Sequence, residues 1–287
     1  MINSLPEKLS PNLEYPNCPL CGEKAFRVAV KNIAKNHHIV RCEACRLRYL
    51  YPRLPESDML KLYENENYFS GEDQGYHDYA LEELSLRKTF SRFVTKISPG
   101  ICSARRLLEI GCGNGYFLAE AKRLSKVKST ALEMSDQSAE KARMHCDDVR
   151  VGGLDELGPD ESFDVIVALQ VIEHIYKPDG FVTTLKEHLS QGGTLILTTP
   201  DYNSPLRFLL RKRWPSYKFP EHVTYFRRSD LKRLLLKHGF KSVQTKSFPH
   251  AFSLQTIANH LGLRLPPKWA GVPVWIPWTS FVVFAIK

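Results

Sequence analysis

The feature that most constrains the fold of this chain is a regular alternation of apolar runs with helix-like segments between residues 106 and 199. The helical patterns cover residues 116–125, 135–145 and 179–189, and Ser135 is placed to cap the second of them. The apolar runs, which predict strands, are RLLEI (106–110), KSTALE (128–133), DDVRV (147–151), FDVIVAL (163–169) and GTLILTT (193–199). Strands that are apolar on both faces and alternate with helices belong to a parallel sheet that helices cover on both sides. The sequence therefore predicts a doubly wound α/β domain.

Further segments extend this pattern at both ends. Apolar residues recur at helical spacing over residues 78–97, and another helix is expected over 230–238 because Gly239 is a natural residue to end it. The closing run SFVVFAIK (280–287) predicts a final strand. On this basis we divide the chain into a leader (1–17), a cysteine-containing unit (18–50), a connector with N-terminal helices (51–98), and the main domain (99–287) with an insertion near 201–228.

Composition narrows the classes of protein to which the chain can belong. Its 287 residues can bury a full core, and 43% hydrophobic with 25% charged residues is ordinary for a soluble globular protein. No apolar run approaches the roughly 20 residues that a membrane-spanning helix needs. Residues 1–17 contain no apolar signal region. We expect a cytoplasmic protein, in which disulfides rarely persist and clustered cysteines bind metal.

The loop after the first strand of the alternation suits a nucleotide-like ligand. It reads Glu109-Ile-Gly111-Cys-Gly113-Asn-Gly115, and glycines allow both positive φ and a close approach of the backbone to a ligand. In a doubly wound sheet, ligands bind beyond the carboxyl ends of the strands, where this loop would lie. The loop does not follow the dinucleotide pattern G-x-G-x-x-G, and the Glu109 carboxylate would repel a pyrophosphate but attract a cation. A positively charged ligand is therefore favoured over NAD.

The pattern E-x-G-x-G-x-G after a first strand resembles motif I of the class I S-adenosylmethionine-dependent methyltransferases, whose sheet is Rossmann-like. The resemblance implies that Gly111, Gly113 and Gly115 hold the amino acid part of S-adenosylmethionine, whose ammonium and sulfonium are cationic. It also implies that Glu133, at the end of the second strand, binds the ribose hydroxyls, because a carboxylate can accept two hydrogen bonds. Met134 then matches an apolar position that packs on the adenine.

Two further positions of the expected cofactor site depart from the family pattern. Many relatives carry an acid directly after a glycine in the loop that follows the third strand, whereas Gly153 stands there in this chain. We assign the adenine contact to the side chain of Asp155 or the backbone of Leu154. Gln170, which follows the fourth strand, is also assigned to the cofactor. It stands where some quinone-pathway relatives have a metal-binding acid, so no catalytic metal is expected.

Four cysteines near the start of the chain form two C-x-x-C pairs, Cys18 with Cys21 and Cys42 with Cys45. Two such turns can complete a tetrahedron of thiolates around zinc, and a site filled by four protein ligands is structural rather than catalytic. A redox role for one C-x-x-C would leave the second pair unexplained. A zinc ribbon that precedes a methyltransferase domain resembles enzymes of bacterial surface-glycan or secondary-metabolite pathways, which indicates the small-molecule branch of the family.

Two histidines are candidates for the chemistry of methyl transfer, which requires an aligned acceptor and, for a hydroxyl, removal of its proton. His174 follows the fourth strand directly, and His222 lies in the insertion after the fifth; both match histidines that are common in the small-molecule branch. A histidine titrates near neutrality and can take a proton from a hydroxyl or phenol. The sequence does not distinguish between the two, and His174 could instead cap the following helix. We predict O-methylation of a small molecule or glycan precursor, although carbon methylation would suit the same site.

Basic residues clustered between 207 and 233 keep a rival interpretation open, an RNA methyltransferase with a zinc-binding recognition module. It is disfavoured because the Asn/Asp-Pro-Pro-aromatic tetrad of enzymes that methylate base nitrogens is missing after the fourth strand. A non-catalytic protein that keeps the fold is a second rival, which the intact glycine loop opposes. The aromatic segments 204–219 and 269–278 could meet a lipid–water interface or a lipid-linked acceptor, but we favour a hydrophobic cap packed on the sheet.

Overall fold

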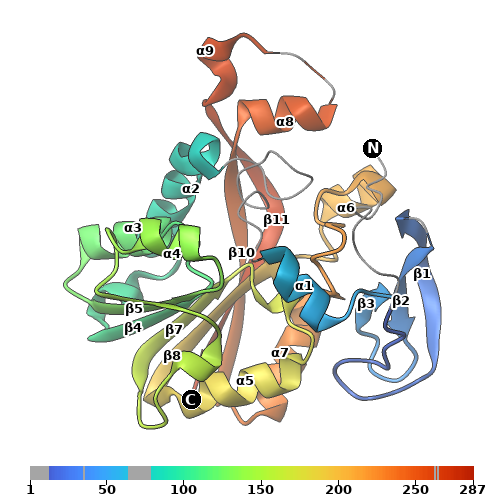
Figure 1. Ribbon diagram of the computed structural model, residues 1–287, viewed down its shortest axis with the longest axis horizontal. Helices are drawn as coiled ribbons and strands as arrows, with labels where there is room; N and C mark the ends of the chain where they lie inside the picture. Colours follow the sequence, from blue (N-terminus) through green and yellow to red (C-terminus); the bar gives the residue numbers. More distant parts are fainter. Residues whose placement is uncertain (1–12, 35, 64–78, 262, 264) are drawn as a thin grey trace.

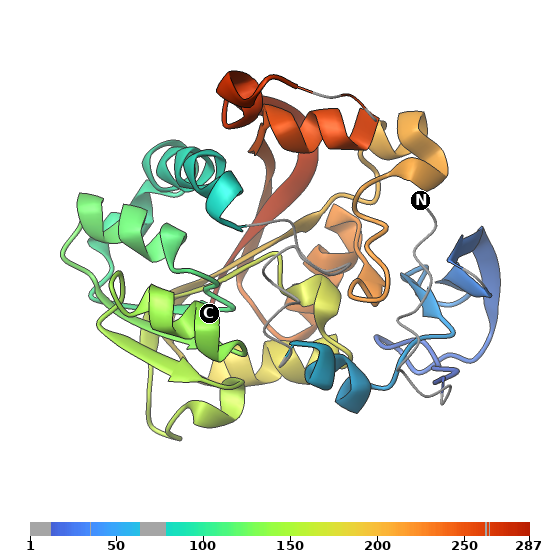
Figure 2. The ribbon, with the colours of Figure 1, turned by 45° about the horizontal axis from the view of Figure 1, so that its top comes forward.

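The structure of the protein is a computed structural model, which describes residues 13–34, 36–63, 79–261, 263 and 265–287 (Figure 1). Residues 1–12 of the expected leader and residues 64–78 of the expected connector lie outside the described residues. The described residues form a central seven-stranded sheet and a smaller four-stranded sheet. Figure 2 shows the N-terminal strands of the small sheet, coloured blue, at one side of the molecule.

The central sheet has the strand order β10-β11-β8-β7-β4-β5-β6. Its parallel part contains the predicted strands: β4 (Arg106–Ile110), β5 (Lys128–Glu133), β6 (Asp148–Val151), β7 (Phe163–Leu169) and β8 (Leu189–Pro200). Each of these strands pairs in parallel with its neighbours in this group, which confirms that part of the expected sheet. The prediction of a wholly parallel sheet is wrong at one edge. There β11 (Pro273–Ile286) runs antiparallel to β8, and β10 (Ser242–Ser253) runs antiparallel to β11.

Strand β10 was not predicted from the sequence. It forms an edge of the sheet, and buried and exposed side chains do not alternate regularly along it. The register of β10 with β11 shifts between Phe248 and His250, so Pro249 falls at the irregularity. A proline is tolerated at an edge or a bulge because no ladder hydrogen bond is lost there. An edge strand interrupted in this way leaves only a weak periodic signal in the sequence.

The helices of the main domain confirm the predicted pattern, with small differences at their ends. They are α3 (Tyr116–Leu124), α4 (Asp136–Ala142), α5 (Pro178–Glu187) and α7 (Arg228–Lys237). Ser135 caps α4 by accepting a backbone hydrogen bond, and Gly239 follows α7 with a φ of +74°. The helix predicted over 78–97 is α2 (Tyr79–Arg92), which continues as a π-helical turn over Phe93–Ile97.

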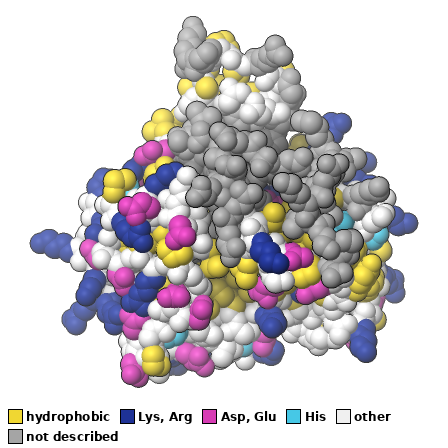
Figure 3. Space-filling view, viewed as in Figure 1, with side chains coloured by type: hydrophobic (Ala, Val, Ile, Leu, Met, Phe, Trp, Pro, Cys, Tyr) yellow, Lys and Arg dark blue, Asp and Glu magenta, His cyan; other side chains and the backbone are white. Residues whose placement is uncertain are grey.

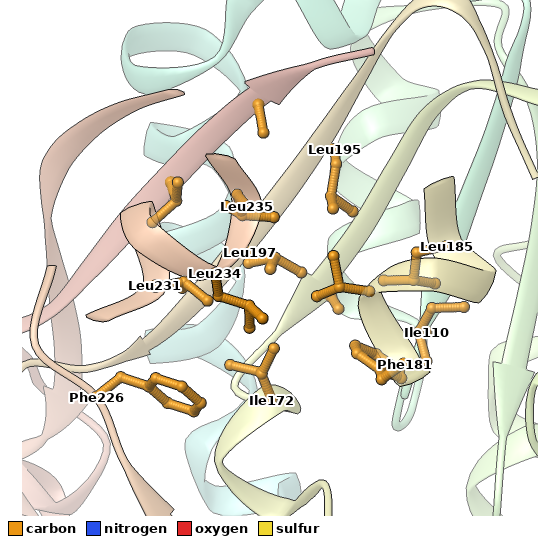
Figure 4. Packing of buried hydrophobic residues seen from close by; sticks show 14 of the residues in the cluster. Ile110, Ile172, Phe181, Leu185, Leu195, Leu197, Phe226, Leu231, Leu234 and Leu235 are labelled. Carbon is orange, nitrogen blue, oxygen red and sulfur yellow. The ribbon is translucent and has the colours of Figure 1, made fainter. Parts of the chain in front are cut away.

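Side chains of the central strands alternate between two apolar layers. In β4, Leu107 belongs to the layer that includes α3 and α4, whereas Leu108 belongs to the layer that includes α5 and α7. Figure 4 shows the second layer, in which Leu185 of α5, Leu234 of α7 and Leu197 of β8 converge. Burial on both faces explains why these strands are apolar at almost every position.

The small sheet combines the cysteine-containing unit with one strand of the insertion. Its order is β1-β2-β3-β9, with the strands β1 (Phe26–Ala34), β2 (His37–Cys42), β3 (Arg48–Tyr51) and β9 (Thr224–Tyr225). Strand β9 comes from the insertion after β8, and it pairs antiparallel with β3. Cys42 and Tyr49 share a buried cluster with Phe226 and Leu231 of the main domain. Residues 18–50 are therefore packed against the insertion and α7.

Shorter helices lie outside the main alternation. They are α1 (Glu56–Tyr63), α6 (Pro205–Leu210), α8 (Leu254–Leu261) and α9 (Pro267–Ala270). The first follows the small sheet, the second lies in the insertion, and the last two connect β10 to β11. Within the described residues, none of the helices combines the length and the hydropathy that crossing a bilayer would require.

The expectation that the aromatic segments form a cap on the central sheet is wrong. In the insertion, Trp214 and Phe219 are buried, but they pack in a cluster with residues of the small sheet. Near the C-terminus, Trp269, Trp275 and Trp278 expose 50%, 40% and 55% of their surface. These tryptophans are too open to solvent to be part of a packed core.

The basic cluster at 207–233 divides into a paired and an exposed part. Arg227 and Arg233 both lie beside Asp230, and Arg228 pairs with Asp201. Arg211, Lys212 and Arg213, directly after α6, are exposed. The net positive charge that reaches solvent is therefore concentrated on the insertion.

Candidate functional site

The glycine loop lies where the direction of the chain across the sheet reverses. From β4 the chain proceeds to β5 and β6 on one side, and then returns to β7 and β8 on the other. Gly111 and Gly113 have positive φ values of 68° and 54°, and Gly115, with a φ of 78°, caps the start of α3. A Cβ at Gly111 would come within 2.8 Å of the Cγ2 of Val171, which lies just after β7. Ligands of doubly wound sheets bind in the crevice at such a point.

Glu133 is the last residue of β5, and its carboxylate is hydrogen-bonded to the glycine loop. Its Oε2 accepts a hydrogen bond from the Gly113 N at 2.7 Å, and its Oε1 accepts one from the Ser135 N at 3.0 Å. Burial raises the pKa of this carboxyl, against the opposing effect of the backbone donors. Each oxygen keeps a second lone pair, so the carboxylate can still accept from two hydroxyl groups.

Glu109, the acid predicted to attract a cation, is 2% exposed. Its Oε2 has no hydrogen-bond partner among the residues that the structure describes. Burial raises the pKa of this carboxyl well above its ordinary value, and the nearby Glu133 carboxylate raises it further. A buried carboxylate without a partner is unfavourable alone and becomes favourable when a cation is placed beside it. The loop thus offers a site that suits a cationic ligand.

The remaining predicted cofactor residues lie at the ends of β5, β6 and β7. Met134 is 42% exposed at the end of β5, so its side chain can lie against a ligand. Leu154 and Asp155 begin a 3-10 turn that follows β6, and Asp155 is exposed. Gln170 has a positive φ of 59°, and its Nε2 donates to the Thr198 Oγ1 on β8 at 3.0 Å. Left-handed backbone at a residue other than glycine is costly and concentrates at functional sites.

The two predicted histidines come together although they are far apart in the sequence. Their ring centroids are 4.8 Å apart, and the rings are nearly perpendicular. His174 ends a 3-10 turn that follows β7. His222 immediately precedes Val223, whose N donates to the Glu173 O at 3.0 Å. This backbone hydrogen bond holds the insertion against the carboxyl end of β7.

Hydrogen bonds distinguish the two rings. The Nδ1 of His222 lies 2.9 Å from the Ser216 O; it must donate to this carbonyl, which leaves the lone pair on Nε2. No second hydrogen bond to this ring occurs within the described part of the chain. In contrast, the Nδ1 of His174 lies 3.0 Å from the Tyr63 hydroxyl. Burial lowers the pKa of both histidines, to about 3 for His222, so both rings are neutral at pH 7.

The four predicted metal ligands form one cluster. The Sγ atoms of Cys18, Cys21, Cys42 and Cys45 all lie within 4.8 Å of one another. The first and last of these Sγ atoms are 3.4 Å apart, and the middle two are 3.6 Å apart. Tetrahedral Zn–S bonds of about 2.3 Å would place neighbouring sulfurs roughly 3.8 Å apart. The hydrogen bond from the Cys18 thiol lowers the pKa of Cys45 to about 5. The donor set and its spacing therefore fit zinc.

Comparison with known proteins identifies the family. The model of a family described as "Methyltransferase domain" matches residues 81–245, more than half of the chain. The chain belongs to this methyltransferase family. A "Probable S-adenosylmethionine-dependent methyltransferase" of Mycolicibacterium smegmatis is 30% identical over 182 residues, covering 62% of this chain and 68% of that protein. The "Ubiquinone biosynthesis O-methyltransferase" of Xanthomonas campestris is 30% identical over 113 residues, covering 37% of this chain and only 46% of that protein.

Solved structures share the fold of the methyltransferase. The magnesium protoporphyrin IX methyltransferase of Synechocystis PCC 6803, with bound SAH, matches 81% of this chain and 100% of its own, with a TM-score of 0.55 at 13% identity. A SAM dependent methyltransferase from Archaeoglobus fulgidus matches 73% of this chain and 99% of its own, with a TM-score of 0.54 at 18% identity. At these identities the likeness concerns the fold, and it confirms the predicted Rossmann-like methyltransferase sheet.

The methyltransferase uses S-adenosylmethionine, and the glycine loop has the properties that this cofactor requires. The buried and unpartnered carboxyl of Glu109 would become negatively charged when a cationic ligand binds beside it. The positive φ of Gly111 and the short distance to Val171 mean that glycine fits best at residue 111, where the loop backbone packs closely against the segment after β7. The assignments of Glu133 to the ribose and of Asp155 to the adenine stay predictions.

Several polar side chains around the histidines were missed from the sequence. Tyr63 ends α1, while Lys218 and Glu221 precede His222 in the insertion. The Lys218 Nζ lies 3.8 Å from the Glu221 Oε1, and burial lowers the pKa of Lys218 to about 8. Glu221 could have been noticed, because an acid precedes each histidine: Glu173 stands before the other one. Tyr63 gives no such signal, since only the fold brings α1 to this place.

Glu173 is a buried acid at the centre of this group. It is 1% exposed, and neither of its carboxylate oxygens has a hydrogen-bond partner among the described residues. Burial raises its pKa to about 8. Ligand atoms of Glu173, His174 and His222 lie within 4.8 Å of one another, a spacing at which they could hold a divalent cation. The charge of Lys218 acts on all three groups and opposes a second cation there.

We expect Glu173→Gln to raise the free energy of unfolding of the methyltransferase at pH 8 by about 4 kcal/mol, with little change at pH 4. The folded protein keeps the Glu173 proton up to about pH 8, whereas the unfolded chain loses it near the ordinary pKa of 4.5. Stability is therefore lost as the pH rises through this range, and glutamine, which cannot ionise, avoids the loss. Urea unfolding at several pH values measures the effect, with the exposed Glu187→Gln as control. A difference from wild type that does not depend on pH would contradict the prediction.

Proposed function

We propose that the methyltransferase transfers a methyl group to an oxygen of a small molecule or glycan precursor, with His222 as the base. The observation that carries this proposal is the Nε2 of His222, which holds a lone pair beside His174 at the carboxyl end of β7. In a doubly wound sheet this edge lies next to the ligand crevice. A neutral imidazole there can take the proton that a hydroxyl loses when its oxygen is methylated.

The residues around His222 have separate tasks in this proposal. When bound, S-adenosylmethionine supplies a methyl group on a cationic sulfonium. The Ser216 carbonyl keeps His222 in the tautomer that has its lone pair on Nε2. When Nε2 takes the proton of the acceptor, the ring becomes an imidazolium beside Glu173, whose carboxyl is neutral below about pH 8 and would stabilise the imidazolium on losing its own proton. The Tyr63 hydroxyl orients the neighbouring ring of His174.

The relatives support an oxygen as the acceptor atom, but they do not identify the acceptor molecule. The matched protein of Xanthomonas campestris is named for O-methylation in ubiquinone biosynthesis, but this chain covers less than half of it. Carbon methylation would need a base at the same place, so it is the first alternative. The exposed residues Arg211, Lys212 and Arg213 are the observation that would favour an RNA acceptor instead.

Transfer of labelled methyl groups tests the proposed function. Purified protein would be incubated with methyl-labelled S-adenosylmethionine and an extract of its own host, which is then divided into RNA and small-molecule-plus-glycan fractions. Label in the second fraction is expected, and heating with hydriodic acid, which releases methyl groups from oxygen as methyl iodide but leaves those on carbon, would show which atom is methylated. Label in the RNA fraction would overturn the proposal. A boiled-protein incubation controls for enzymes of the extract.

We also propose that Cys18, Cys21, Cys42 and Cys45 bind a structural zinc ion that keeps β3 in place. Cys42 ends β2, and Cys45 stands in the turn that leads into β3. This turn is further fastened by α7, because the Arg233 Nη2 donates to the Cys45 O at 2.6 Å. A closed site with four thiolate ligands would fix the two turns relative to each other.

The position of β3 matters because the segment that contains His222 is hydrogen-bonded to this strand. The Leu50 N of β3 donates to the Val223 O at 3.0 Å, and Tyr49 pairs with Thr224. His222 is the residue directly before this pairing. A shift of β3 would therefore move the proposed base away from the carboxyl end of β7.

We expect Cys42→Ser to abolish binding of zinc and to lower the midpoint of thermal unfolding by about 5–10 °C. Turnover should fall as well, because the pairing of β3 with β9 loosens. Metal analysis of the purified protein and calorimetry measure these effects. Cys146→Ser is the matched control, since Cys146 is also buried but lies outside the cluster. Wild-type protein that contains no zinc after purification in its presence would contradict the assignment.

A further inference from the structure

The antiparallel edge of the central sheet continues past the other strands as a projecting arm. Strand β11 pairs with β8 only from Ser280 onward, because Ser280 faces Pro200, the last residue of β8. Beyond this point, residues 250–253 and 273–276 pair only with each other, and α8 and α9 lie at the end of the extension (Figure 1). We call the described residues between 250 and 279 the arm. It leaves the sheet at the carboxyl end of β8, the same edge that carries the cofactor site.

The arm and the neighbouring α6 expose large apolar side chains. Helix α6 contacts β11, while α8 contacts both α9 and β10, so these elements are contiguous. The exposed side chains, which we call the docking surface, are Phe208 (61%), Leu209 (77%), Trp269 (50%), Val272 (38%), Trp275 (40%) and Trp278 (55%). Exposed apolar side chains that gather on adjacent elements mark an interaction site, whereas scattered ones need no explanation.

The charge around the docking surface is basic. Arg211, Lys212 and Arg213 follow α6 and are exposed. The guanidinium of Arg207 lies 4.1 Å from the ring centre of Phe208, so a further cation borders the surface. The sequence has no Asp or Glu between residues 231 and 287, and the lobe at the top of Figure 3 accordingly shows no acidic side chain. The carboxylate of Glu82 on α2 does reach the arm, but there it accepts hydrogen bonds from Ser253 and Thr256. An apolar surface bordered mainly by cations is complementary to an anionic partner that also has an apolar interior.

We propose that the docking surface binds the surface of an anionic lipid bilayer, with the tryptophans at the level of the headgroups. Tryptophan prefers this level because its ring is apolar and its N–H is polar. Leu209 and Val272 support a bilayer over a nucleic acid, since aliphatic side chains gain from contact with acyl chains and cannot stack on bases as aromatic rings do. The Lys and Arg side chains after α6 would contact lipid phosphates.

The arm that presents the docking surface starts beside the expected cofactor site. Ser280, where the arm leaves the sheet, donates from its Oγ to the Gln170 Oε1 at 3.5 Å. Docking would therefore bring the cofactor edge of the sheet toward the bilayer, where an acceptor dissolved in or linked to lipid could be reached. The binding of lipid is nevertheless independent of the acceptor and of the proposed base, so each can fail without the other.

Vesicle sedimentation tests the proposal with the full chain. We expect binding to vesicles of phosphatidylglycerol and phosphatidylcholine, and much weaker binding to phosphatidylcholine alone. Phe208→Ser/Leu209→Ser and Arg211→Gln/Lys212→Gln should each lower the partition coefficient by about tenfold or more. The matched controls are Met144→Ser, where Met144 is 77% exposed near α4, and the exposed pair Lys126→Gln/Lys128→Gln at the amino end of β5. Circular dichroism confirms that each variant is folded.

Tryptophan emission gives a second measurement that does not depend on substitution. Brominated phosphatidylglycerol should quench the exposed tryptophans of the arm but not Trp214, which is 4% exposed. Equal losses in the control variants, or no preference for anionic vesicles, would overturn the proposal. So would binding of these residues to single-stranded RNA without binding to vesicles. A dimer in solution that Phe208→Ser/Leu209→Ser dissociates would assign the surface to a second copy of the chain and would also overturn it.

Discussion

His222→Asn is expected to lower turnover by a factor on the order of 10²–10⁴ and to leave the affinity for S-adenosylmethionine unchanged. The side-chain nitrogen of asparagine can still donate to the Ser216 O, as Nδ1 does in the structure. It offers no basic nitrogen in the place of Nε2. The substitution therefore keeps the hydrogen bond to the Ser216 O and removes only the ability of residue 222 to accept a proton. Single-turnover methyl transfer at saturating cofactor measures the rate, and calorimetry measures the affinity.

His188→Asn is a matched control for this experiment. The Nδ1 of His188 also donates to a backbone carbonyl, the Glu161 O at 2.8 Å, and the ring is also buried, but it lies before the amino end of β8. This variant should keep full turnover. His174→Asn is expected to lower turnover less than His222→Asn, because the Nδ1 of His174 is already bonded to the Tyr63 hydroxyl and the proposed base is His222. Unchanged turnover in His222→Asn would contradict its role as base. Loss of wild-type turnover on chelation, restored by Mg²⁺, would instead assign a bound cation to this group.

The strands that can be predicted from the sequence are those buried on both faces, because nearly every side chain in them must be apolar. Strand β7 is buried on both faces, so nearly every residue of FDVIVAL is apolar and the strand is evident. Strand β10 is partly exposed and contains Pro249 at an irregularity, so it carries no such pattern. The two-residue strand β9 is too short to be found from periodicity. Its existence depends on pairing with β3, which is far away in the chain.

In the candidate site, too, the features set by local sequence were predictable, and those that depend on distant segments meeting were not. The conformation of the glycine loop was predictable because it is local: strand, glycines, helix and the acid Glu133 follow one another within one β–α–β unit. The acceptor side is assembled from α1, the turn after β7 and the insertion, which meet only in the folded chain. His174 and His222 were found because their residue type suggested chemistry. Tyr63 has a common residue type and lies in a connector, so nothing in the sequence related it to His174.

Glu133→Ala is expected to weaken the binding of S-adenosylmethionine at least tenfold, which corresponds to about 1.4 kcal/mol. Alanine has neither of the two carboxylate oxygens that would accept hydrogen bonds from the ribose hydroxyls. The hydrogen bonds that the carboxylate accepts from the Gly113 N and the Ser135 N are lost as well. Both losses should weaken binding, because the second frees the glycine loop, to which we assign the amino acid part of the cofactor. Isothermal titration calorimetry measures the change in affinity directly.

Comparison with S-adenosylhomocysteine separates a role at the ribose from a role at the cation. The two compounds share the ribose but differ at the sulfonium, so Glu133→Ala should weaken the binding of both by the same factor. Glu140→Ala, an exposed position on α4 of the same β–α unit, should leave both affinities unchanged. Unchanged affinity in Glu133→Ala would contradict the assignment to the ribose. A much larger loss for S-adenosylmethionine than for S-adenosylhomocysteine would place Glu133 beside the sulfonium charge, the role for which the structure offers the unpartnered oxygen of Glu109.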